Sequence, residues 1–228
     1  MRQLRIAPIV ALSVALMLGA PRVYAQETRR IFAGWLVGVS TLSADGRAVI
    51  SPSEAATSQY KPENGVALDV FAGRHLARYF TLQANYMWNR NDLTLVGSRA
   101  GASGSAFYEQ QRRSTQHVFV ADTLVYFRPL GSAIRPYLGT GLCLVRFSSN
   151  EIVRSLSVGL APPAAAITAT EIALRSHVGI DVILTRRLSA RYSFSETISR
   201  NPISPHLTPT GERRLANFQN LFGFVTHF

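Results

Sequence analysis

Hydrophobic and polar residues alternate with a period of two along most of the chain beyond residue 30. The clearest stretch covers residues 79–89, where Phe80, Leu82 and Tyr86 alternate with polar residues such as Gln83 and Asn85. This period places successive side chains on opposite faces of a β-strand. The pattern predicts eight strands, over residues 31–41, 65–73, 79–89, 116–127, 135–145, 170–184, 188–197 and 215–228.

The predicted connections alternate between long and short. A soluble sheet with one wet face would give the same period of two, but it has no reason to lengthen every second connection. Outer-membrane barrels combine short periplasmic turns with long extracellular loops. We therefore predict an all-β fold, an eight-stranded antiparallel up-and-down transmembrane β-barrel whose apolar face meets lipid. The long links cover residues 42–64, 90–115, 146–169 and 198–214, and the short ones cover 74–78, 128–134 and 185–187.

The N-terminal segment has the pattern of a cleavable signal peptide. Arg2 and Arg5 precede an apolar stretch over residues 6–18, and a small-residue cleavage site ends at Ala25, before Gln26. That stretch is shorter than the roughly 20 residues of a membrane-spanning helix, which argues against the alternative of an uncleaved anchor. The expected organisation is a signal peptide over residues 1–25 and a barrel domain over 26–228.

Charge and cysteine content narrow the function classes. The formal net charge is +11, and the excess is carried almost entirely by scattered arginines. Secretion argues against nucleic acid as the partner of this charge, so we expect contact with outer-membrane lipid and lipopolysaccharide phosphates. Cys143 is the single cysteine, which rules out an intramolecular disulfide and a metal site built on paired thiolates. No cofactor is expected.

Three segments resemble the small outer-membrane β-barrel families, those of OmpA-type transmembrane domains and OmpX-like proteins. They are the glycine-flanked start at residues 34–38, the strand at residues 136–141, and the C-terminal run at 222–228. The resemblance covers the whole expected mature chain and implies residence in the bacterial outer membrane after export through the periplasm. Unlike full-length OmpA, the sequence stops at the eighth predicted strand, so no cell-wall tether is carried over.

The C-terminal run also implies a partner during biogenesis. Phe222, Phe224 and the terminal Phe228 lie on one face of the last predicted strand. In this family such a run looks like the assembly signal that the barrel-insertion machinery reads. Insertion by that machinery is therefore expected.

Charged residues on the inward face define the candidate site. An eight-stranded barrel has an interior that side chains fill, or that holds one small ligand. Mixed charges in so narrow a space are expected to pair, because a buried unpaired charge is costly. We expect a polar plug, with an ion path or a small porin-like channel as the alternative. The predicted lumen network consists of Asp69, Asp122, Glu171, Arg175, His177, Asp181 and Arg191.

Arginines in the long connections give the expected working surface. They suit acidic polymers and phosphates, although solvation and electrostatic anchoring of the rim explain them more simply than a specific ligand site does. His206 lies near Ser204 and Thr208, but no strand context brings a nucleophile, base and orienting acid together, so no enzyme is expected. The predicted role is structural or surface-interactive, in membrane integrity or adhesion, and a secreted lipocalin-like binder remains the soluble alternative. The surface arginines are Arg99, Arg112, Arg113, Arg154, Arg200, Arg213 and Arg214.

Overall fold

The computed structural model describes residues 30–102, 104–156 and 159–228. The predicted signal peptide, with its cleavage site between Ala25 and Gln26, lies outside these residues. No helix in these ranges is both long enough and apolar enough to cross a membrane. The described elements are β1 (Ile31–Leu42), β2 (Asp45–Ser51), β3 (Glu54–Pro62), β4 (Gly65–His75), β5 (Phe80–Gly101), β6 (Gly104–Tyr126), β7 (Ile134–Leu156), β8 (Ala166–Ile183), β9 (Leu188–Arg200), the short 3-10 helix η2 (Ser204–His206) and β10 (Arg214–His227).

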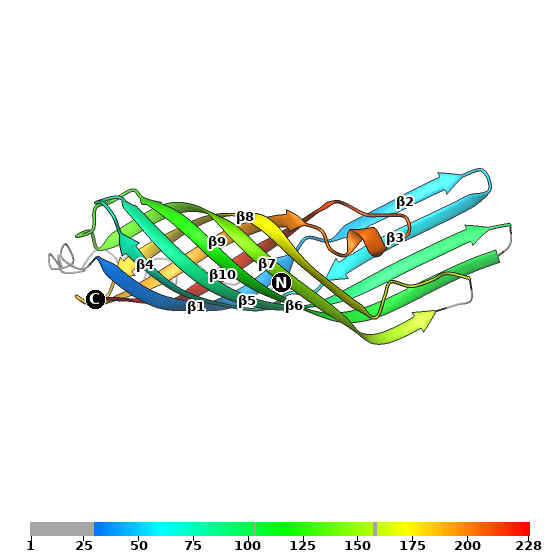
Figure 1. Cartoon of the computed structure of the whole chain (residues 1–228), viewed down its shortest axis with the longest axis horizontal. Coiled ribbons are helices and arrows are strands. Elements are labelled where there is room, and N and C mark those ends of the chain that lie inside the picture. Colours follow the sequence, from blue (N-terminus) through cyan, green and yellow to red (C-terminus); the bar gives the residue numbers. More distant parts are fainter. Residues whose placement is uncertain (1–29, 103, 157–158) are drawn as a thin grey trace, which may run out of the picture.

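Eight of these strands form a closed antiparallel ring (Figure 1). The ring runs β1, β4, β5, β6, β7, β8, β9, β10 and returns to β1. Closure is made where β1 pairs with β10, in a register that sets Phe32 opposite His227 and Trp35 opposite Phe224. A closed ring has no edge strand, although residues 166–173 at the start of β8 pair with β7 alone. The prediction of an eight-stranded up-and-down barrel is confirmed.

The faces of the wall follow the predicted register. On β5, Leu82 is 48% exposed and Tyr86 36% exposed, whereas Gln83 and Asn85 between them are buried. Around the ring the outward side chains are mainly apolar, whereas the buried inward face mixes polar and charged side chains with an apolar cluster that includes Phe32, Met87 and Leu221. A slip of one residue would have reversed every face. Such a surface suits hydrocarbon outside and a polar interior.

The strands run much further than the sequence analysis predicted. Residues 90–115 were expected to form a loop, but β5 and β6 pair without interruption from Phe80 and Val125 to Gly101 and Gly104. The expected loop over residues 146–169 likewise begins as a continuation of β7. Both faces of these extensions are rich in polar and small residues, so the alternation fades while the backbone ladder continues.

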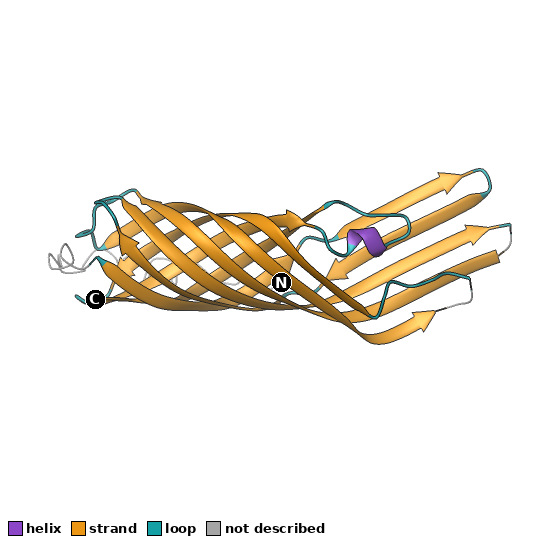
Figure 2. Cartoon of the chain, in the orientation of Figure 1, coloured by secondary structure: helices purple, strands orange, loops and turns teal. Residues whose placement is uncertain are grey.

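A further hairpin occupies the predicted loop over residues 42–64. Its strands β2 and β3 pair with each other, and β3 then pairs with the outer half of β5. The exchange of partners is direct, since β4 lies beside β5 up to Arg90 and β3 takes over from Leu93. As a result β2, β3, β5, β6 and β7 extend as long strands beyond one end of the barrel (Figure 2). We call this the projecting end.

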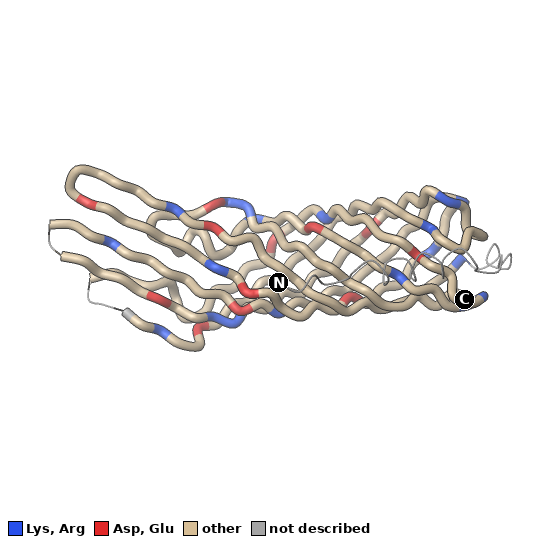
Figure 3. The backbone as a smooth tube through the Cα atoms, turned by 180° about the vertical axis from the view of Figure 1, so that it is seen from behind, with Lys and Arg blue, Asp and Glu red and all other residues tan. Residues whose placement is uncertain are grey.

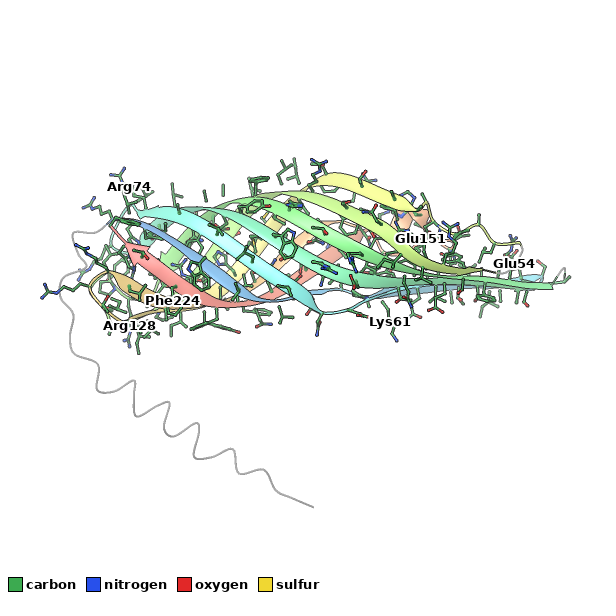
Figure 4. The ribbon with its side chains drawn as sticks, turned by 90° about the horizontal axis from the view of Figure 1, so that it is seen from below. Glu54, Lys61, Arg74, Arg128, Glu151 and Phe224 are labelled. Carbon is green, nitrogen blue, oxygen red and sulfur yellow. The ribbon has the colours of Figure 1, made fainter. Side chains whose placement is uncertain are left out.

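The opposite end carries the short connections and is called the short-turn end. Here the backbone N–H of Phe228 donates to the carbonyl of Ile31 at 2.9 Å, which brings both ends of the described chain together. Basic residues are frequent along the backbone at this end (Figure 3), and Figure 4 labels two of them, Arg74 and Arg128. The exposed arginines of the short-turn end are Arg30, Arg74, Arg78, Arg128, Arg186 and Arg187.

Candidate functional site in the barrel lumen

Arg191 is the central cation of the lumen. It projects inward from β9, is 2% exposed, and binds Asp181 of β8 through two contacts: Nε to Oδ1 at 2.6 Å and Nη2 to Oδ2 at 2.8 Å. Its Nη1 donates across the lumen to Gln83 Oε1 of β5 at 2.7 Å. A two-point guanidinium–carboxylate contact is directional as well as strong. The position of Arg191 is therefore set by two other strands.

Aromatic side chains complete the surroundings of Arg191. Tyr126 of β6 donates its hydroxyl to the same carboxylate at 2.8 Å and accepts from Arg191 at 2.9 Å. The guanidinium carbon lies 4.7 Å from the ring centre of Phe71 (β4), 5.2 Å from Tyr137 (β7) and 5.6 Å from Phe32 (β1). Cations over aromatic faces gain further stabilisation when water is excluded. One side chain thus contacts six of the other seven strands in the ring.

A second ionic cluster surrounds Arg175 of β8. Its Nη1 lies 2.7 Å from Asp122 Oδ2 on β6, and its Nη2 lies 3.7 Å from Asp69 Oδ2 on β4. Asn85 donates to both oxygens of Asp69, at 3.1 and 3.0 Å. His177 Nε2 lies 3.5 Å from Asp122 Oδ2. These residues, with Asp181 and Arg191, form what we call the charged layer.

Glu171 differs from the other predicted lumen residues. The six others are buried in the charged layer, whereas Glu171 is only partly buried. It has inward parity on β8 and lies opposite Val145, and no ion pair joins it to another residue within the described ranges. The structure therefore brings six of the seven predicted residues together and leaves Glu171 nearer the projecting end.

Three groups near the short-turn end were missed by the sequence analysis. Arg135 places its guanidinium carbon 3.8 Å from the ring centre of Tyr126. The His75 and His227 rings stack with centroids 6.2 Å apart. Arg135 lies on the same face of β7 as Cys143, so the alternation along this strand could have identified it as an inward residue. His75 and His227 are the last residues of β4 and β10, where the alternation is harder to follow.

A set of uncharged polar side chains lies in the lumen between the charged layer and the projecting end. Asn217 donates to Gln116 Oε1 at 2.8 Å, and Gln219 donates to Asn89 Oδ1, also at 2.8 Å. Ser40 donates to Asn217 Oδ1 at 2.7 Å. Both amide contacts cross from β10 to strands on other parts of the ring. We call these five residues the amide layer.

An apolar cluster closes the lumen at the projecting end. The segment after β9, which includes η2, turns inward and buries Ile203 and Leu207 to 1% and 3% exposure. This segment was predicted as a polar loop, yet its apolar side chains have no other place to be shielded from water. We call the cluster the apolar cap; its members are Leu42, Tyr60, Leu93, Leu95, Tyr108, Phe147, Ile167, Ile203, Leu207 and Leu215.

Arg112 corrects one part of the surface prediction. It was grouped with exposed arginines, but it is 0% exposed and points inward beside the apolar cap. Its Nε donates to the Ser149 hydroxyl at 3.0 Å and its Nη2 to the Ser149 carbonyl at 2.9 Å. Burial is the main reason that the pKa of Arg112 is lowered from its usual value. The predicted surface role does not apply to this residue.

The remaining surface arginines divide into two groups. Arg99 pairs with Glu54 at 2.6 Å, Arg113 with Asp92 at 3.7 Å, and Arg154 with Glu151 at 2.5 Å. The other three are exposed at the outer ends of β9 and β10, and within the described residues none of them forms an ion pair. These three are Arg200, Arg213 and Arg214.

Comparison with known proteins concerns the fold. No protein-family model matches the chain. No curated protein matches it. The solved structures similar to it include Neisserial surface protein A, at 14% identity and TM-score 0.48 over 87% of this chain and 97% of that one. OprG from Pseudomonas aeruginosa has 11% identity and TM-score 0.49, over 89% and 98%. Ail of Yersinia pestis has 8% identity and TM-score 0.45, over 88% and 100%.

These likenesses are distant, and the barrel assignment rests on the strand pairing of this chain itself. The ring closes through β1 and β10 whatever the neighbours are. The chain is an all-β, eight-stranded antiparallel barrel, and the solved structures similar to it include small outer-membrane β-barrels.

Proposed function

We propose that this chain is a bacterial outer-membrane protein with a structural or surface-interaction role and a lumen plugged by its own side chains. The closed ring and its apolar outer face support membrane residence. With short turns toward the periplasm, the projecting end is extracellular. The protein is proposed to be exported through the periplasm and to carry out no catalysis.

The observation that carries the plug is that buried side chains enter the lumen at three successive levels along its length. Arg191 contacts six other strands in the charged layer. The amide layer lies above it, and the apolar cap closes the extracellular mouth. An eight-stranded barrel has little interior to spare. Together the three levels favour a barrel that stabilises the membrane over one that conducts.

The projecting strands support a surface role. β2 lies at the edge of the projecting sheet and exposes Ile50 at 83% and Val49 at 54%. An edge strand with unpaired backbone groups and exposed apolar side chains offers a place where a partner can bind. Membrane integrity and adhesion are therefore both within the proposal, and the extracellular ligand is unassigned.

Two partners follow from other surfaces. Phe222 and Phe224 lie on the closing strand β10, and Phe228 directly follows it. Phe222 and Phe228 face outward, at 53% and 66% exposed, and the three residues fit recognition by the barrel-insertion machinery. Exposed arginines at both rims fit the phosphates of outer-membrane lipid and lipopolysaccharide.

Planar-bilayer recording tests the plug. The purified protein is expected to give no stable single-channel steps. The matched variant Arg191→Ser with Asp181→Ser removes one cation and one anion of the charged layer without leaving either partner charge behind. Because the amide layer and the apolar cap remain, this variant is also expected to give no stable steps. Stable steps from the unmodified protein would contradict the plug and favour a small porin-like channel.

A further inference from the structure

The barrel wall is incomplete where the outer part of β8 runs beyond its pairing with β9. Their ladder ends at Leu174 opposite Ile198. On either side the pairing continues further, from β7 to β8 as far as Asn150 opposite Ala166, and from β9 to β10 as far as Arg200. Residues 166–173 of β8 are therefore paired on one side only. We call the gap that this leaves the β8–β9 notch; both strands are labelled in Figure 1.

Three unpaired cations border the notch. Arg200 and Arg214 are direct cross-strand partners on β9 and β10, and Arg213 precedes Arg214. All three are exposed, and within the described residues none has an acidic partner, in contrast to Arg99 and Arg113. Like charges directly opposite each other on neighbouring strands are destabilising. An anion placed between them would relieve that repulsion.

Below the arginines the notch becomes an apolar groove on the lipid-facing surface. A shallow, open depression of about 410 Å³ is lined by the three arginines together with Leu142, Ile172, Leu174 and Ile198. Ile172 and Leu142 are 78% and 67% exposed. The groove thus offers cations at its outer end and hydrocarbon contacts along its length.

A second pocket adjoins the same arginines on the other side, and most of the residues that line it have polar side chains. Its volume is about 450 Å³, and Arg200 and Arg213 line both the depression and this pocket. Ser204 also lines it; this residue is 2% exposed, and its hydroxyl has no hydrogen-bond partner among the described residues. Thr210 adds an exposed hydroxyl. A buried hydroxyl without a partner is costly, so the pocket is suited to a polar ligand.

We propose that the β8–β9 notch binds one phosphorylated glycolipid of the lipid A type. The phosphate lies among Arg200, Arg213 and Arg214, a sugar hydroxyl reaches Ser204, and acyl chains follow the apolar groove. This rests on the proposed function, because it requires the projecting end to face the outer leaflet. Arginine forks suit phosphate oxygens, and the neutral hydroxyls beside them favour a sugar headgroup over a simple phospholipid.

The test measures lipid binding by native mass spectrometry of the purified full-length protein in detergent, titrated with diphosphoryl lipid A. The site variant is Arg200→Gln with Arg213→Gln and Arg214→Gln. Its matched control removes three exposed arginines at the opposite rim, Arg74→Gln, Arg128→Gln and Arg186→Gln. From the strength of charge-assisted contacts, the site variant should weaken binding by about tenfold or more, and the control by less than about twofold.

Two further arms identify the headgroup. Ser204→Ala should weaken lipid A binding measurably, by about twofold to tenfold, and leave phosphatidylglycerol binding unchanged. Phosphatidylglycerol itself should compete poorly for the site. Equal losses in the site and control variants, or equal affinity for phosphatidylglycerol, would overturn the proposal.

Failure of this proposal can be told apart from failure of the proposed function. A barrel that migrates differently before and after boiling, and that is recovered with outer membranes, supports the location even if lipid A does not bind at the notch. Recovery in the soluble periplasm would remove both proposals.

Discussion

The charged layer and the amide layer fill the same lumen with different chemistry. In the charged layer, Asp181 and Arg191 are removed from water and each relies on the other. In the amide layer, Asn217 and Gln219 are equally buried but carry no charge. Desolvating an ion costs several kcal/mol, whereas an amide hydrogen bond contributes only about 0.5–1.5 kcal/mol net. The two layers are buried to a similar extent, but the loss of one partner should lower the free energy of unfolding much more in the charged layer than in the amide layer.

The largest effect is expected from Arg191→Met. The change leaves Asp181 buried without its cation, and breaking a buried pair in this way costs about 3–5 kcal/mol of unfolding free energy. Urea unfolding in lipid vesicles measures it, with the fluorescence of the two tryptophans, Trp35 and Trp88, as the signal. A loss below about 1 kcal/mol would mean that the charged layer is far better hydrated than its burial indicates.

An intermediate effect is expected when both ions are replaced, as in Arg191→Met with Asp181→Leu. Removal of both members of the pair leaves neither Arg191 nor Asp181 as an unpaired buried charge. Such paired replacements often change the stability little. The hydroxyl of Tyr126 and the amide of Gln83 still lose a partner, so we expect a loss of about 1–3 kcal/mol. If the double variant is less stable than Arg191→Met alone, the physical reason given for the charged layer is wrong.

The smallest effect is expected from Asn217→Ala in the amide layer. It removes the contacts to Gln116 and Ser40, at 2.8 and 2.7 Å, but leaves no charge behind. The expected loss is about 0.5–1.5 kcal/mol under the same unfolding conditions. A loss as large as that of Arg191→Met would erase the distinction between the two layers.

The location of the site was largely predictable, and its connections were not. Alternation assigned Asp122, Arg175 and Arg191 to the inward face, because the parity of a residue on a strand is a local property. Which of them meet depends on the stagger of strands around the ring, as in the contact from Arg191 on β9 to Gln83 on β5. That stagger joins residues far apart in the chain, so one sequence alone does not reveal it.

The outer parts of the molecule were the least predictable. Residues 90–115 and the β2–β3 hairpin were read as loops because their polar and small residues break the alternation. Backbone pairing with a neighbouring strand supplies hydrogen bonds whatever the side chains are, so the strands continue. Arg112 was assigned to the surface for the same reason, since its burial depends on Ser149 of a different strand.

The amino-acid sequence by itself determined the strand period, the two faces of the wall and the alternation of short and long connections. These follow from side-chain chemistry acting over a few neighbouring residues. Only the tertiary structure decided that the long connections become strands, that Ile203 and Leu207 fold inward as part of the apolar cap, and that a notch opens between β8 and β9. Each of these depends on which strand lies beside which, and that is set by closure of the whole ring.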